Sequence, residues 1–208
     1  MAALLALSGA FGWGAGDFLG GLAARRLAVL TVLAVSQAVG LVSVLVWVVF
    51  SEDAFPGVVD LLPAAGAGIA AMVGLGALYR GFAIGAMGIV APISAAAPVV
   101  PLAVDASRGD LPDALQWVGV ALVLTGIGVL SRESRAEEQR VVAAGAGLAV
   151  VAALGFGLFF VGIVAVLSSL YPVVTIVLAW VVLGERLSAA KRAGGVVALG
   201  GAALVAAA

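Results

Sequence analysis

One acidic residue, Asp17, lies well inside an apolar stretch of this sequence and is the first candidate for chemistry. If that stretch crosses a membrane, an ionised carboxylate there is costly and usually faces a cavity or a partner. Trp13 precedes Asp17 by one helical turn and would lie on the same face. Two interpretations stay open. Asp17 belongs to a solute or proton site with an aromatic wall, or it lies near the membrane surface and pairs with Arg25 or Arg26.

Other candidate solute-binding residues are polar residues and prolines within, or at the ends of, apolar segments. They are Gln37, Tyr79, Arg80, Ser94, Pro98, Ser168, Ser169, Tyr171 and Pro172. The polar side chains also have structural uses, such as bonds between helices, bonds to their own helix backbone, or snorkelling of Arg80 to the membrane surface. Arg80 would otherwise balance the charge of an anionic solute. The two prolines interrupt helical bonding at matched positions of two halves, which points to a binding site.

The composition requires lipid as the solvent. Of 208 residues, 64% are hydrophobic and 10% are charged, whereas soluble domains are about half apolar and a quarter charged. The chain has neither cysteine nor histidine, which excludes thiol and Ser-His-Asp catalysis, so we predict no enzyme, no cofactor and no metal site. A net charge of -1 gives no case for nucleic acid as a partner. The 29 glycines favour close helix packing, with Gly12, Gly16 and Gly20 in one stripe with Ser8.

A helix needs about 20 apolar residues to cross a bilayer, and this rule predicts about eight spans in an all-α bundle. The expected spans are residues 2–22, 28–50, 61–79, 89–104, 114–130, two within 141–183, and 193–207. The most charged stretch, residues 131–140, is expected to be a solvated linker between two parts of the chain.

The two parts are related by an internal repeat. Pro98 recurs as Pro172, and Gly119 recurs as Gly194 at almost the same offset. Nearer the N-terminus, the Gly-Trp-Gly of residues 12–14 recurs as Gly-Phe-Gly at residues 155–157. The offset of this N-terminal match exceeds the offset of the Pro98–Pro172 match by about the length of two spans, so two helices are missing from the second part. We therefore predict a first repeat of five helices at residues 1–130 and an incomplete second repeat of three at residues 141–208.

The segments GWGAGDFLGGLAARR (residues 12–26), LGALYRGFAIGAMGIVAP (75–92) and VAVLSSLYPVVTIVLAWVVLGERL (164–187) resemble the EamA branch of the drug/metabolite transporter superfamily. The resemblance implies two inverted five-helix repeats around a central solute pathway, and alternating access. It implies a multi-pass protein of the plasma membrane that moves small metabolites or drug-like solutes. Proton coupling through Asp17 is a further hypothesis. The chain departs from the family pattern by lacking two helices of the second repeat.

Because two helices are missing, a second function stays open. In it the chain is a shortened, non-transporting membrane protein that acts as a packing partner or is a degenerate remnant. A homodimer would be one way to fill the place of the pair. The orientation of the termini stays open, because the distribution of Lys and Arg favours termini outside the cell whereas the resemblance implies termini in the cytoplasm.

Overall fold

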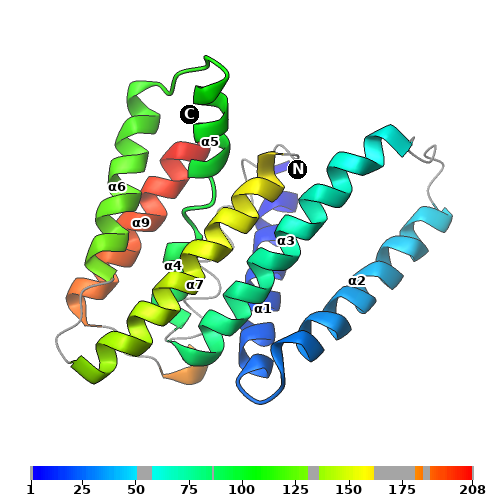
Figure 1. Cartoon of the computed structure of the whole chain (residues 1–208), viewed down its shortest axis with the longest axis horizontal. Helices are drawn as coiled ribbons and strands as arrows, with labels where there is room; N and C mark the ends of the chain where they lie inside the picture. Colours follow the sequence, from blue (N-terminus) through cyan, green and yellow to red (C-terminus); the bar gives the residue numbers. More distant parts are fainter. Residues whose placement is uncertain are drawn as a thin grey trace.

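The computed structural model describes residues 2–50, 58–85, 87–130, 136–161, 181–184 and 188–207, and within these ranges the regular structure is helical throughout. The helices are α1 (Ala2–Ala24), α2 (Val29–Phe50), α3 (Val58–Ile84), α4 (Met87–Ser94), α5 (Val99–Ser107), α6 (Ala114–Leu130), α7 (Ala136–Val161) and α9 (Ala189–Ala207) (Figure 1). This confirms the all-α bundle expected from the composition.

Four helical stretches of the described residues are long and apolar enough to cross a bilayer. They are Val29–Phe50, Leu61–Ile84, Met87–Ser107 and Ala143–Val161. Helices α1, α6 and α9 occupy three more of the expected spans. The second span expected within residues 141–183 falls almost wholly outside the described residues, so the number eight stays a prediction.

The fourth expected span, residues 89–104, lies within the candidate span Met87–Ser107, which consists of two helices. Helix α4 ends at Ser94, and a turn at residues 95–98 leads into α5. Proline lacks an N–H, so Pro98 cannot donate to the carbonyl four residues earlier. The neighbouring bonds tighten to a spacing of three: Val99 N donates to Ala96 O at 3.0 Å and Val100 N to Ala97 O at 3.1 Å.

Helix α4 is the centre of the bundle, with every one of its eight residues buried. It packs on α7 and α9 and also contacts α3 and α6. Its Val90 fits against glycines of two neighbours, because a Cβ built at Gly81 of α3 or Gly145 of α7 would meet a Val90 methyl at 3.0 or 3.5 Å. In contrast, α5 has no buried residue. The chain therefore passes from a fixed core helix to a peripheral one at the turn.

Glycines let the long helices touch backbone to backbone. Helices α3 and α7 cross at Gly74 and Gly155, where a Cβ built at Gly155 would lie 2.6 Å from Gly74 Cα and 2.7 Å from Ala70 O. Toward the other end of the pair, Gly81 of α3 is near Leu148 of α7. Residue numbers rise along one helix as they fall along the other, so α3 and α7 are antiparallel. Small residues at such a crossing are typical of membrane bundles.

Helices α6 and α9 form a second antiparallel pair with the same kind of contact (Figure 1). A Cβ built at Gly126 would lie 2.5 Å from both Ala198 N and Gly194 O. A Cβ built at Gly201 would lie 2.5 Å from Gly119 O and 2.6 Å from Val123 N. No side chain larger than hydrogen fits at either position unless the two helices move apart.

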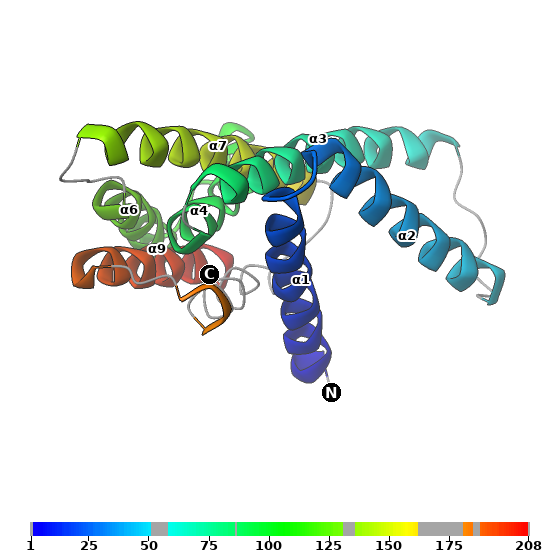
Figure 2. The same ribbon diagram turned by 90° about the horizontal axis from the view of Figure 1, so that it is seen from below.

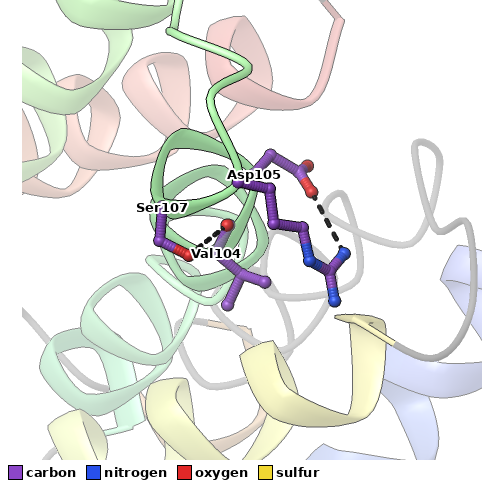
Figure 3. Close-up of polar contacts among 4 residues, drawn as sticks. Val104, Asp105 and Ser107 are labelled. Carbon is purple, nitrogen blue, oxygen red and sulfur yellow. Dashed lines mark hydrogen bonds and ion pairs between the residues drawn. The ribbon is translucent and has the colours of Figure 1, made fainter.

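The connection from α5 to α6 is a tight polar turn. Ser107 Oγ donates to Val104 O at 2.6 Å, and Arg108 lies 3.7 Å from the Asp105 carboxylate (Figure 3). Gly109 follows with a φ of +103°, which favours glycine. Asp113 then caps α6: Gln116 N donates to Asp113 Oδ1 at 2.8 Å, and Asp113 N donates to Gln116 Oε1 at 3.0 Å. This reciprocal pair is a capping box and defines where α6 begins.

Candidate functional site

Asp17 is buried within α1 and lacks a partner for part of its carboxylate. Its side chain is only 2% exposed, and Asp17 is the only charged residue found in the buried class among the described residues. Within the same residues, no hydrogen-bond donor reaches Asp17 Oδ2. A buried polar atom without a partner is rare and calls for an explanation, such as a catalytic or ligand-binding role.

The structure does not support the alternative in which Asp17 pairs with Arg25 or Arg26. Among the described residues, no ion pair joins Asp17 to either arginine. Arg25 turns to the end of α3, where its Nε donates to Phe82 O at 3.1 Å and its Nη2 reaches Gly85 O at 3.5 Å. These carbonyls lie at the C-terminal end of a helix and lack intrahelical donors, which explains why a cation binds there.

Tyr79 of α3 packs against the turn of α1 that follows Asp17. Its ring lies against Gly20, where a Cβ would collide with the phenol ring and its oxygen. Gly20 follows Asp17 by three residues, so both lie on the face of α1 that meets α3. Tyr79 is 4% exposed, and its phenol lies against Gly20, one helical turn after Asp17. The structure therefore brings two predicted site residues together, on different helices.

The surroundings of this pair are apolar. Tyr79 shares one hydrophobic cluster with Phe18 of α1, Phe82 of α3, and Phe156 and Phe160 of α7. Trp13, the expected aromatic wall, lies one turn before Asp17 and is 37% exposed. A carboxylate and a phenol in such a setting can bind a proton, or a donor group of a solute, with little competition from water.

A second group of predicted residues lies at the break between α4 and α5. Ser94 is fully buried, and its Oγ donates to Ala91 O at 2.8 Å, which is the structural use of its hydroxyl proton. Pro98 stands at the start of α5. Because Val99 N donates to Ala96 O, the carbonyl of Ala95 receives no backbone donor among the described residues. The break thus leaves the Ala95 carbonyl oxygen, at the core of the bundle, without a backbone donor from the described residues.

The remaining predicted residues are not part of either group. Gln37 is exposed on α2, and its Nε2 donates to Met72 Sδ of α3 at 2.7 Å, which is the expected use as a bond between helices. Arg80 is exposed, in keeping with snorkelling. The predicted site residues Ser168, Ser169, Tyr171 and Pro172 lie outside the described residues.

The role of Arg25 was not predicted from the sequence. The available signal is the end of α3, where Gly85 follows the helix and its last carbonyls need donors. A second surprise is the glycine stripe of α1. Gly20 is packed against Tyr79, whereas a Cβ at Gly12 or Gly16 would meet nothing within 4 Å among the residues that the structure describes. Helix packing of this stripe is thus seen at Gly20, and packing at Gly12 and Gly16 stays a prediction.

Residues 1–132 match the EamA-like transporter family. No curated protein and no solved structure matches the chain.

Proposed function

This chain belongs to the EamA-like transporter family, and we propose that it moves a small solute across the membrane by alternating access. Members of this family are multi-pass membrane proteins that transport small solutes, and they are not enzymes. The observation that carries the proposal for this chain is the buried carboxylate of Asp17 with an unpartnered oxygen beside Tyr79. The plasma membrane is the expected location.

The proposed machinery consists of two related repeats, residues 1–130 and 141–208, which rock about a site between them. The glycine contacts between α6 and α9 support the repeat. In the repeat, Gly119 corresponds to Gly194 and Gly126 to Gly201 at one constant offset. In the structure, Gly126 meets Gly194 and Gly119 meets Gly201 where the two helices cross. The family match ends at residue 132, within the charged segment at residues 131–140.

Alternating access needs a site near the middle of the membrane and helices able to adopt two arrangements. The Asp17–Tyr79 pair would bind the solute, and the carbonyl of Ala95 at the α4–α5 break would offer an acceptor from the core. The break would also let α5 move while α4 stays packed, because α4 is wholly buried and α5 is not.

Asp17 would couple transport to a proton. A charged carboxylate is tolerated where it meets water or a solute donor, whereas sealing it in an apolar cavity favours the neutral form. The side chain would therefore release its proton when the site opens or binds solute, and take one up before the empty site closes. Tyr79, held against Gly20, would present its hydroxyl to the solute or to the carboxylate.

The test uses the full chain reconstituted in liposomes that contain a trapped pH indicator. A panel of amino acids, amines, sugars and nucleosides is screened for saturable uptake, and proton movement is recorded with each. We expect uptake of at least one solute to carry protons in the wild type, and Asp17→Asn to abolish uptake or remove its dependence on pH. Asp110→Asn, in the exposed turn after α5, makes the same chemical change outside the bundle and should behave as wild type.

Two outcomes contradict the proposal. Unchanged pH dependence in Asp17→Asn would refute proton coupling through this residue while leaving transport intact. A wild-type chain that is folded in liposomes but shows no saturable uptake across the panel would favour the alternative function, a shortened membrane protein that packs with a partner or is a remnant.

A further inference from the structure

The charges inside the bundle are unbalanced. Asp17 is the only charged residue in the buried class among the described residues, and its side chain is 2% exposed. Every arginine whose side chain the structure describes is exposed, and these are Arg25, Arg26, Arg80, Arg108 and Arg192. A buried charge without a partner is strongly disfavoured. The group that completes this site therefore brings a positive charge, or a proton, from outside the described residues.

The site also lacks a hydrogen-bond donor. No donor among the described residues reaches Asp17 Oδ2. Arg25, two turns along the same helix, donates instead to Phe82 O at 3.1 Å. An ionised carboxylate can only accept hydrogen bonds, so the missing group must donate one. A protonated amine supplies a positive charge and an N–H together, whereas a quaternary ammonium supplies only the charge and an alcohol only the donor.

Aromatic rings lie against the turn of α1 that follows Asp17. A Cβ built at Gly20 would collide with the Tyr79 ring, and one built at Gly21 would collide with the Phe82 ring. Both rings come from α3 and are buried, at 4% and 1% exposure. Figure 2 shows α1 extending away from the layer of α3 and α7, with its N-terminal end farthest from that layer. The two rings thus lie where α1 meets the layer, and such rings can hold an apolar group and attract a cation to their faces.

We propose that the solute bound at Asp17 is a protonated primary or secondary amine with an apolar body. Its N–H donates to Oδ2, its charge balances the carboxylate, and its apolar body packs among the buried aromatic side chains of the cluster that contains Tyr79 and Phe82. The inference rests on the proposed function, because it names the chemical class of the solute at the same site. A proton alone would also neutralise Asp17, and the solute would then be neutral; comparing an amine with its alcohol separates the two cases.

The same charges argue against amino acids and other solutes that carry a carboxylate. A second carboxylate in the site would lie near that of Asp17, and none of the described arginine side chains is buried to bind it. Like charges in a site with little water repel strongly. An aromatic amine should therefore bind more tightly than the amino acid with the same ring.

The first test measures binding to the full chain in micelles by isothermal titration calorimetry. The probes share one phenyl ring and are 2-phenylethylamine, 2-phenylethanol, phenylalanine and 2-phenylethyl-trimethylammonium. We expect the amine to bind about tenfold or more tighter than each of the others, because it alone supplies a charge and an N–H without a second carboxylate. Another probe that binds as tightly as the amine, or an amine that does not bind, would overturn the proposal.

The second test asks whether Asp17 is the group that the amine binds. Asp17→Asn keeps the shape of the side chain and removes its charge, so affinity for 2-phenylethylamine should fall at least about tenfold while affinity for 2-phenylethanol stays close to that of the wild type. Asp110→Asn, in the exposed turn after α5, is the matched control and should bind both probes as the wild type does. An amine affinity that Asp17→Asn leaves unchanged would show that the amine binds elsewhere.

Uptake into liposomes separates this inference from the proposed function. Saturable uptake of 2-phenylethylamine that is lost in Asp17→Asn supports both. Saturable uptake of a sugar or a nucleoside, with no binding of the amine, would overturn the inference and leave the transport function intact. Binding of the amine at Asp17 without uptake of any solute would support the amine site and refute transport.

Discussion

The crossing of α6 and α9 offers the sharpest quantitative test, through Gly126→Ala. The new Cβ would lie 2.5 Å from Ala198 N and from Gly194 O, whereas ordinary contacts begin near 3.4 Å. Both obstacles are backbone atoms, which cannot rotate aside. The helices must therefore separate by about 1 Å, a gap that removes a quarter to a half of each dispersion contact across the interface.

The magnitude follows from two opposing effects. An extra methyl in a packed site costs roughly 1–3 kcal/mol, and replacing glycine by alanine recovers up to about 1 kcal/mol of helix propensity. The net destabilisation of Gly126→Ala should be about 1–2 kcal/mol. Gly128→Ala is the matched control on the same helix, because its Cβ would meet nothing within 4 Å. That variant should be as stable as wild type, or more stable by up to about 1 kcal/mol.

The assay is equilibrium unfolding in mixed micelles followed by circular dichroism. Gly201→Ala should resemble Gly126→Ala, because it also meets backbone atoms, at 2.5 and 2.6 Å. Gly194→Ala should cost less, since its nearest obstacle is a methyl of Val129 at 2.8 Å, on a side chain that can shift. A Gly126→Ala variant as stable as Gly128→Ala would refute backbone contact at this crossing.

Three further substitutions test the cap of α6, the arginine at the end of α3 and the break between α4 and α5. Asp113→Ala removes the cap of α6 and should lower the free energy of unfolding by about 1 kcal/mol, measured by the same micelle titration. Arg25→Gln removes the charged donor at the end of α3 and should cost about 1 kcal/mol, with faster hydrogen exchange at the last turn of α3; Arg26→Gln, which has no side-chain bond among the described residues, should change neither. Pro98→Ala restores an N–H that can donate to Ser94 O, so it should raise stability by about 1 kcal/mol and slow solute uptake several-fold in liposomes. Unchanged uptake would show that the break has no role in transport.

Part of the site could be foreseen from residue type alone. Asp17 was identifiable because a lone carboxylate in a long apolar segment is energetically costly wherever it faces lipid. Tyr79 was a candidate as a polar residue at the end of a span. The sequence did not reveal that the two belong together, because their proximity depends on how α1 lies against α3 and on the small size of Gly20, which admits the phenol ring.

The sequence also left the partner of Arg25 open, since Arg25 follows Asp17 by about two helical turns and a long side chain can point either way. Only the tertiary structure places the end of α3 within its reach. Similarly, the sequence indicated that Pro98 disrupts a helix, but not that the disruption would divide a wholly buried segment from an unburied one. The difference in burial between the two segments arises because α3, α6, α7 and α9 surround α4.

The class of the protein, most helix boundaries and the family follow from the sequence by itself, because hydrophobic length and turn residues are local properties. Which glycines are packed and which are open was decided by tertiary structure alone. Gly12 and Gly155 have the same local sequence pattern, yet within the described part of the chain a Cβ at Gly12 would meet nothing within 4 Å, whereas Gly155 touches Gly74. The physical reason is that a glycine leaves room for a neighbouring helix but makes no contact that selects one. The arrangement of the other helices decides whether a neighbour lies there.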